Sequence, residues 1–98
     1  METSKYKWKR IKDFFYPNEN RKMPNWNNLM DAVEKVEMDD MEVSIIDNEC
    51  EIGTNGYYHR SIISEIADTK KQAVFNALNN YVIWYLTERK DWIVEGKI

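Results

Sequence analysis

The residue types that most often carry catalysis or bind metals are scarce in this chain of 98 residues, which has one cysteine, Cys50, and one histidine, His59. One of each cannot complete a tetrahedral zinc site without carboxylates or a second subunit. The same scarcity argues against Cys-His and Ser-His-Asp catalysis. We expect Cys50 to pack in the core, and His59 to be a surface or hydrogen-bonded structural residue. An enzymatic role would rest on His59 with the neighbouring Tyr57 and Tyr58, so the sequence predicts a protein that is not an enzyme.

Signals for cofactors and metals are equally sparse. With only Gly53, Gly56 and Gly96, the chain has neither a nucleotide-binding glycine-rich loop nor a phosphate loop, so no cofactor is predicted. Nearby carboxylates at positions 39, 40 and 42 lack the loop spacing and the terminal bidentate Glu of a calcium-binding hand. We interpret them as a solvated acidic turn and predict no metal site.

Negative charge is concentrated in residues 34–51, which hold eight carboxylates and one lysine. Alternating apolar residues between positions 41 and 52 predict a hairpin with Asp47 and Asn48 at its turn. Ile46 then faces Glu49, and Ser44 faces Glu51. The candidate partner-binding residues around this hairpin are Asp39, Asp40, Glu42, Asp47, Glu49 and Glu51.

This acidic hairpin has two interpretations. Glu42, Glu49 and Glu51 are expected to share its wet face beside Asp47, where like charges cost stability unless a partner or counterions neutralise them. Such a face can bind a basic protein surface, with its carboxylates imitating the phosphates of nucleic acid. The alternative, which the sequence favours equally, is that the acidic residues maintain solubility and discourage edge pairing.

Positive charge is concentrated in residues 1–22, which carry a local balance of +4 and form a basic aromatic N-terminal arm. Cations and aromatic rings alternate there, as in proteins that bind nucleic-acid phosphates and stack on bases. The candidate nucleic-acid-binding residues are Lys7, Trp8, Lys9, Arg10 and Lys12. The competing interpretation, favoured by the net charge of −3, is that Trp8 and Ile11 pack on the core while the lysines stay in water.

The predicted elements give an α+β fold, with residues 23–98 as a single domain. The arm contains a short amphipathic segment before Pro17, and Asn25 is a suitable N-cap for the next helix. The hairpin follows, with a third strand predicted within residues 57–66. A long C-terminal helix then begins at Thr69, whose spacing from Gln72 fits a capping box. The fold is therefore a helix, a two- or three-stranded antiparallel sheet and a long helix, preceded by the arm.

Apolar residues cover most of the long helix, and only Gln72, Asn76, Asn79 and Asn80 mark an exposed side. A helix with so wide an apolar arc needs cover from two directions, by the sheet and by a second helix or a second subunit. One hypothesis is a homodimer interface formed by Phe75, Val82, Ile83 and Leu86. The alternative is that the aromatic arm covers the same patch.

Three strings carry a family resemblance: WNNLMDAVEKVE at residues 26–37, KKQAVFNA at 70–77 and VIWY at 82–85. Over roughly residues 26–85 the chain resembles small uncharacterised proteins of phages and prophages of Bacteroidetes. The resemblance implies the order helix, hairpin and helix, and a phage context, but no catalytic residue. It does not extend to the basic arm.

The leading hypothesis for function is a small non-enzymatic phage or prophage protein that binds a host protein. Inhibition of a bacterial defence component, as by anti-CRISPR proteins, would fit that context. The alternative is a nucleic-acid-binding accessory protein that uses the basic arm. The lone cysteine, the lack of a secretory signal and the lack of an apolar run of about 20 residues predict the cytoplasm of the bacterial host, away from membranes.

Overall fold

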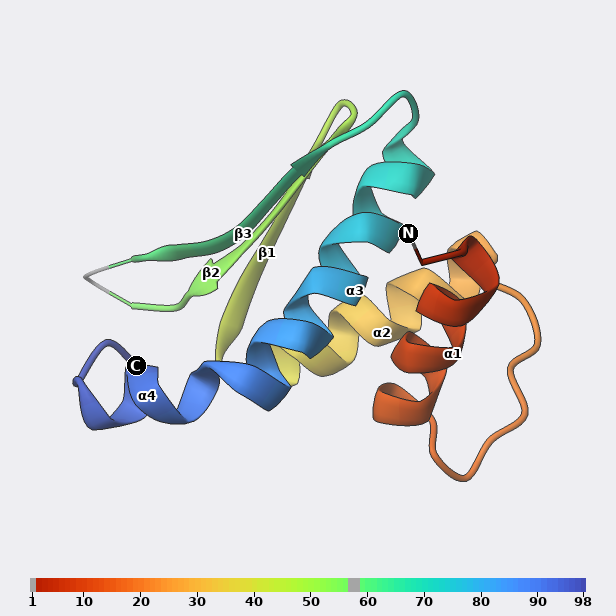
Figure 1. The fold of residues 1–98 in the computed structure, drawn as a ribbon. Helices are drawn as coiled ribbons and strands as arrows, with labels where there is room; N and C mark the ends of the chain where they lie inside the picture. The colour runs from red at the N-terminus through yellow and green to blue at the C-terminus, as the bar shows by residue number, and fades with distance from the viewer. Residues whose placement is uncertain (1, 57–58) are drawn as a thin grey trace.

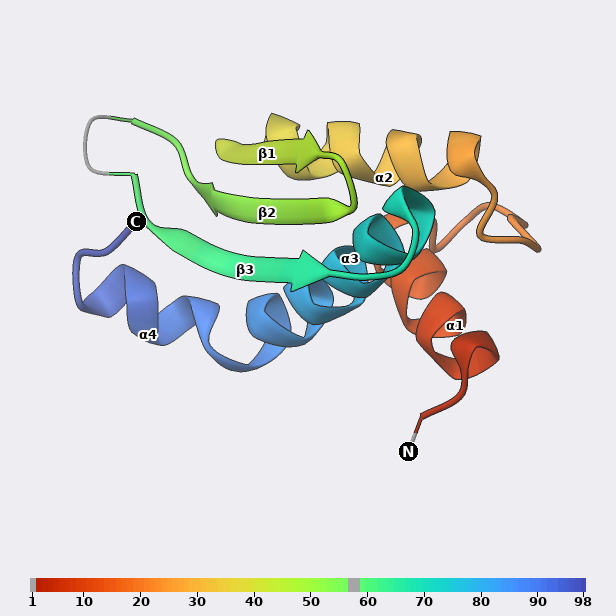
Figure 2. The same ribbon diagram turned by 90° about the horizontal axis from the view of Figure 1, so that it is seen from above.

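A computed structural model describes residues 2–56 and 59–98 of the chain, whose helices and strands form an α+β fold (Figure 1). In chain order the elements are α1 (Ser4–Phe15), α2 (Trp26–Met38), β1 (Met41–Ile46), β2 (Glu49–Thr54), β3 (Ser61–Ile66), α3 (Lys70–Thr87) and α4 (Arg89–Val94). The strands form one antiparallel sheet in the order β1-β2-β3. Helices α2 and α3 cover one face of this sheet, and α1 packs on α3 from the side away from the sheet (Figures 1 and 2).

The hairpin has the predicted turn and register. Asp47 adopts a positive φ of 52°, which its short polar side chain tolerates, and Ile46 pairs with Glu49 while Ser44 pairs with Glu51. The predicted third strand is confirmed over Ser61–Ile66, whereas Tyr57 and Tyr58 lie outside the described residues.

Both predicted helix caps are present. The side-chain oxygen of Asn25 accepts a hydrogen bond from the amide of Asn28 at 2.8 Å and starts α2. Thr69 caps α3 by accepting from the amide of Gln72 at 3.1 Å. The side chain of Gln72 donates to Asn76 at 2.9 Å, along the helix rather than back towards the cap.

Helix α1 is the second cover that the long helix requires. Its residues Trp8, Ile11 and Phe15 are buried in the same core cluster as the apolar residues of α2, α3 and the sheet. The ring of Phe15 stacks on that of Tyr81 in α3, with the ring centroids 6.3 Å apart. Residues 1–22 therefore contribute to the same hydrophobic core as residues 23–98, and the interpretation that Trp8 and Ile11 pack inside is correct.

Two predictions about the surface of α3 are wrong for this reason. Asn79 was expected on the exposed side, but it is only 3% exposed and accepts a hydrogen bond from Arg10 of α1 at 2.8 Å. Phe75 and Val82 were expected in a dimer interface, but both are buried within the single chain. Only Ile83 and Leu86 of that predicted interface remain exposed.

The C-terminal segment forms a short helix beyond the end of α3 (Figures 1 and 2). Helix α4 begins at Arg89 and ends at Val94. Trp92 packs edge-on against Trp84 of α3, with ring centroids 5.7 Å apart. This contact fixes the C-terminus near the end of the sheet where β2 meets β3 (Figure 2).

Candidate functional site

The face of the sheet that points away from α2 and α3 is the first candidate site. No helix or strand within residues 2–56 and 59–98 covers it (Figures 1 and 2). Met41, Cys50 and Ile52 are buried beneath the helices. Because side chains alternate along a strand, the residues next to them in sequence point to the uncovered face. We call this surface the acidic sheet face; its residues are Glu42, Ser44, Ile46, Glu49, Glu51, Ser64 and Ile66.

Cross-strand pairing arranges these residues in rows. Ile46, Glu49 and Ile66 form the row nearest the β1–β2 turn, with Glu49 between two isoleucines that are 66% and 74% exposed. Ser44, Glu51 and Ser64 form the next row. The Ser64 hydroxyl lies 3.5 Å from a carboxylate oxygen of Glu49. The face therefore combines carboxylates with a small exposed apolar strip at one end.

His59 lies at the other end of the acidic sheet face, between two strands. Its Nδ1 atom is 2.7 Å from the carbonyl oxygen of Thr54 and 3.7 Å from a carboxylate oxygen of Glu42. Its Nε2 atom is 3.1 Å from a carboxylate oxygen of Glu51. Both ring nitrogens thus face acceptors, which favours the doubly protonated ring. The hydrogen bond to Glu51, followed by that to Thr54, raises the pKa of His59 above its ordinary value.

Gly53 makes room for this arrangement. A Cβ atom at position 53 would lie 2.9 Å from Nε2 of His59 and 2.7 Å from the carbonyl oxygen of Arg60. The strand has no room for a side chain at position 53 because the imidazole ring of His59 occupies that space. A lone glycine inside a strand often marks such a close approach, and here it seats the only histidine of the chain.

The predicted partner-binding residues are not all brought together. Glu42, Glu49 and Glu51 share the acidic sheet face as predicted, with Asp47 in the turn beside Glu49. Asp39 and Asp40 lie at the opposite end of the hairpin, before β1, and line a separate hollow of about 910 Å³ with Arg89 and Lys97 among its other residues. The reason is geometric, because six-residue strands separate the two ends by about 17–20 Å.

The predicted nucleic-acid-binding residues on α1 are divided in the same way. Trp8 is buried, and its indole N–H donates to the carbonyl of Arg21 at 3.0 Å, so it offers no ring for stacking. Arg10 is held by Glu2 and Asn79. Lys9 pairs with Asp13 at 2.5 Å, while Lys7 and Lys12 are both half-buried. The aromatic part of that prediction is wrong at Trp8 because this ring is part of the core.

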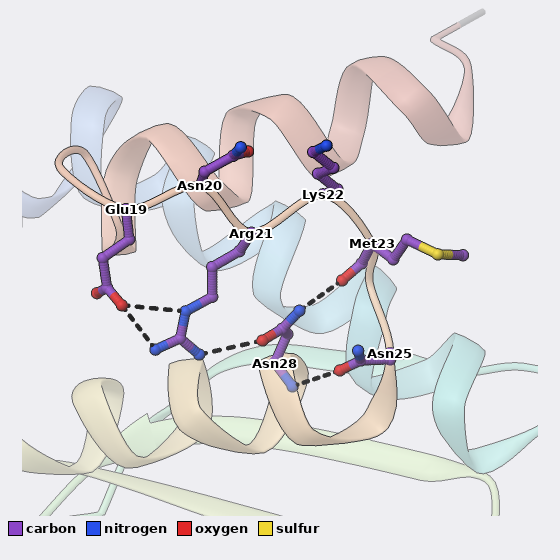
Figure 3. Close-up of a pocket in the computed structure, with 7 residues that line it drawn as sticks. All are labelled: Glu19, Asn20, Arg21, Lys22, Met23, Asn25 and Asn28. Carbon is purple, nitrogen blue, oxygen red and sulfur yellow. Dashed lines mark hydrogen bonds and ion pairs between the residues drawn. The ribbon is translucent and has the colours of Figure 1, made fainter.

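Another hollow, of about 590 Å³, lies in the loop between α1 and α2 (Figure 3). Arg21 organises it by donating to Asp31 at 2.6 Å, to Glu19 at 3.0 Å and to Asn28 at 3.1 Å. Its guanidinium also lies 4.0 Å from the ring centre of Tyr16. The donors of Arg21 are thus engaged by the chain itself, which makes this cluster a support for the loop.

Side chains that could bind a metal do not gather among residues 2–56 and 59–98. No group of three or more histidine, cysteine or acidic side chains there is arranged to hold a metal ion. Cys50 is buried as expected, and burial raises its pKa to about 11, which disfavours the reactive thiolate. Among the described residues, no helix is long and apolar enough to cross a membrane.

Comparisons with known proteins assign no family. No protein-family model matches the chain, and neither the curated proteins nor the solved structures yield a match. The comparisons therefore do not bear on the family resemblance or on function.

Proposed function

We propose that this protein is a small non-enzymatic binding protein that engages a basic surface of a partner protein through the acidic sheet face. The observation that carries the proposal is an uncovered sheet face on which Glu42, Glu49 and Glu51 gather beside two exposed isoleucines. Carboxylates steer a basic partner and fix its orientation, whereas exposed apolar side chains supply area to bury. The face offers both.

The resemblance to phage and prophage proteins supports a bacterial host protein as the partner. A component of host defence that binds nucleic acid is the class that we propose, because a protein that binds nucleic acid presents a basic surface, and an acidic face can compete for that surface. The role needs no catalytic residue.

The competing interpretation of the same face is solubility and protection of sheet edges. It accounts for the carboxylates, but not for Ile46 and Ile66, which are exposed on either side of Glu49. A face that served only to keep the protein in solution would gain from polar residues at both positions. This difference favours binding as the role of the face.

The test compares two variants with the same change in net charge. Glu42→Lys with Glu49→Lys reverses two of the three carboxylates on the face. It removes the ion pair between Glu42 and His59 but does not change Glu51. Glu34→Lys with Glu37→Lys places the same charges on exposed positions of α2 and is the control. Each tagged protein is used to capture proteins from nuclease-treated bacterial lysate, and captured proteins are identified by mass spectrometry and remeasured as purified pairs.

The proposal expects a protein that binds the wild type and the control, is lost from the face variant and dissociates at high salt. Ile66→Asp should weaken the same pair without reversing any charge. Equal binding of that purified protein to the face variant and the control would refute the role of the acidic sheet face. Loss of solubility in the face variant, with binding retained, would instead support the competing interpretation.

A further inference from the structure

A cluster of lysines on α1 forms a surface that is independent of the acidic sheet face. Lys5, Lys9 and Lys12 follow the spacing i, i+4, i+7 and so lie on one side of the helix. Together with Thr3, Tyr6 and Lys22 they line a hollow of about 300 Å³. We call this surface the lysine hollow.

Lys22 reaches the lysine hollow from a different segment of the chain. Trp8 of α1 holds the backbone at Arg21 through the hydrogen bond to its carbonyl. The Arg21 side chain points towards α2, where it contacts Asn28 and Asp31, whereas Lys22 points towards α1 (Figure 3). The tertiary structure therefore places a fourth lysine beside three that share a helix face.

The charges of the lysine hollow are poorly neutralised by the chain. Asp13 pairs with Lys9, but the ion pairs among residues 2–56 and 59–98 include none to Lys5, Lys12 or Lys22. The first turn of α1 also contains no acidic residue. Converging ammonium groups repel one another, and an anion bound among them relieves that cost.

We propose that the lysine hollow binds the phosphate backbone of single-stranded nucleic acid. Lysine binds phosphate as a point charge, and positions 5 to 12 of a helix extend over about 10 Å, enough to meet more than one phosphate. Tyr6 lines the same hollow and is 57% exposed, so an unpaired base can stack on its ring. The exposed ring favours single strands over duplex, and nucleic acid over an acidic protein.

The first measurement uses the full-length chain and a fluorescent single-stranded oligothymidylate of about 12 nucleotides, a length within the usual site sizes. Fluorescence anisotropy is followed over a range of salt concentrations. Each phosphate contact on a single strand contributes about −0.7 to the slope of log K against log salt, so three or four lysines predict a slope of about −2 to −3. Absence of binding at low salt would overturn the proposal.

Matched charge reversals locate the site. Lys12→Glu with Lys22→Glu should weaken binding at least tenfold, to order of magnitude, and bring the slope about 1.4 closer to zero because two contacts are lost. Lys70→Glu with Lys71→Glu gives the same net charge at exposed positions on α3 and should retain the wild-type slope. Circular dichroism of both variants should match that of the wild type, which checks that they fold. An equal loss in the two variants would mean that net charge, and not the hollow, controls binding.

Two further measurements separate nucleic acid from other anions. Tyr6→Leu should weaken oligothymidylate binding while the salt slope stays unchanged, since it removes stacking and no charge. A polyglutamate peptide of similar charge should bind more weakly than the oligonucleotide and should not respond to Tyr6→Leu. A peptide that binds as tightly as the oligonucleotide would overturn the assignment to nucleic acid. Neither measurement involves Glu42 or Glu49, so a negative result in either one does not bear on the proposed function of the acidic sheet face.

Discussion

Truncation of Ile11 to alanine tests whether α1 belongs to the cooperative core. Ile11 is 0% exposed and belongs to the core cluster that includes α3. Ile11→Ala removes three carbon atoms, and at about 0.8 kcal/mol for each buried carbon group the transfer free energy lost is about 2.4 kcal/mol. The cavity left behind adds to this loss, so the expected decrease in the free energy of unfolding is about 3–4 kcal/mol. That is a large share of the 5–15 kcal/mol typical of a whole domain.

The assay is urea unfolding followed by tryptophan fluorescence, which reports on the buried Trp8 and Trp84. Ile11→Val provides a graded comparison with an expected loss of about 0.5–1.5 kcal/mol. Lys5→Ala changes an exposed position of the same helix and should alter stability by about 0.5 kcal/mol or less. If Ile11→Ala lowers the free energy of unfolding by less than about 1 kcal/mol, α1 does not unfold together with the core, and the reasoning that makes it part of the core is refuted.

Three further predictions concern the sheet. Gly53→Ala should lower the free energy of unfolding by about 1–3 kcal/mol in urea melts, because its Cβ would collide with the His59 ring and the backbone of Arg60; an unchanged midpoint would refute this packing. In NMR titrations the pKa of His59 should lie above 6.5 and return towards it in Glu51→Gln, and a wild-type value at or below 6.5 would contradict the hydrogen bond between His59 and Glu51. Since folding raises this pKa, the stability contributed by His59 is complete below pH 6.5 and is lost as the pH rises through the folded-state value. Cys50 should be alkylated by iodoacetamide much more slowly in the folded protein than in urea, and equal rates would show that β2 opens readily.

The local features of the fold were predictable because each depends on neighbours in sequence. Alternation of apolar residues, together with a turn at Asp47, defines the hairpin register and places Glu42, Glu49 and Glu51 on one face. The caps at Asn25 and Thr69 also act within one helical turn. Such contacts leave a readable pattern, since the residues that make them lie within a few positions of one another.

Contacts between distant segments were not predictable in the same way. Asn79 looked like an exposed residue because its partner, Arg10, lies 69 positions earlier in the chain. Lys22 was not among the candidate residues because its place beside α1 depends on the Trp8–Arg21 hydrogen bond. One available signal was Gly53, whose position inside a strand marks a close approach and here identifies the seat of His59.

The separation of charge in this fold also changes the argument from net charge. A total of −3 disfavours nucleic-acid binding only if the charges act together on a ligand. The acidic sheet face and α1 lie on opposite sides of the layer formed by α2 and α3, in a molecule whose shortest extent is 27 Å (Figure 1). At physiological ionic strength exposed charges are screened over about 8 Å, so a strand at the lysine hollow experiences the lysines and little of the distant carboxylates. Local charge, rather than the total, therefore decides what each surface can bind, and the two surfaces can be tested one at a time.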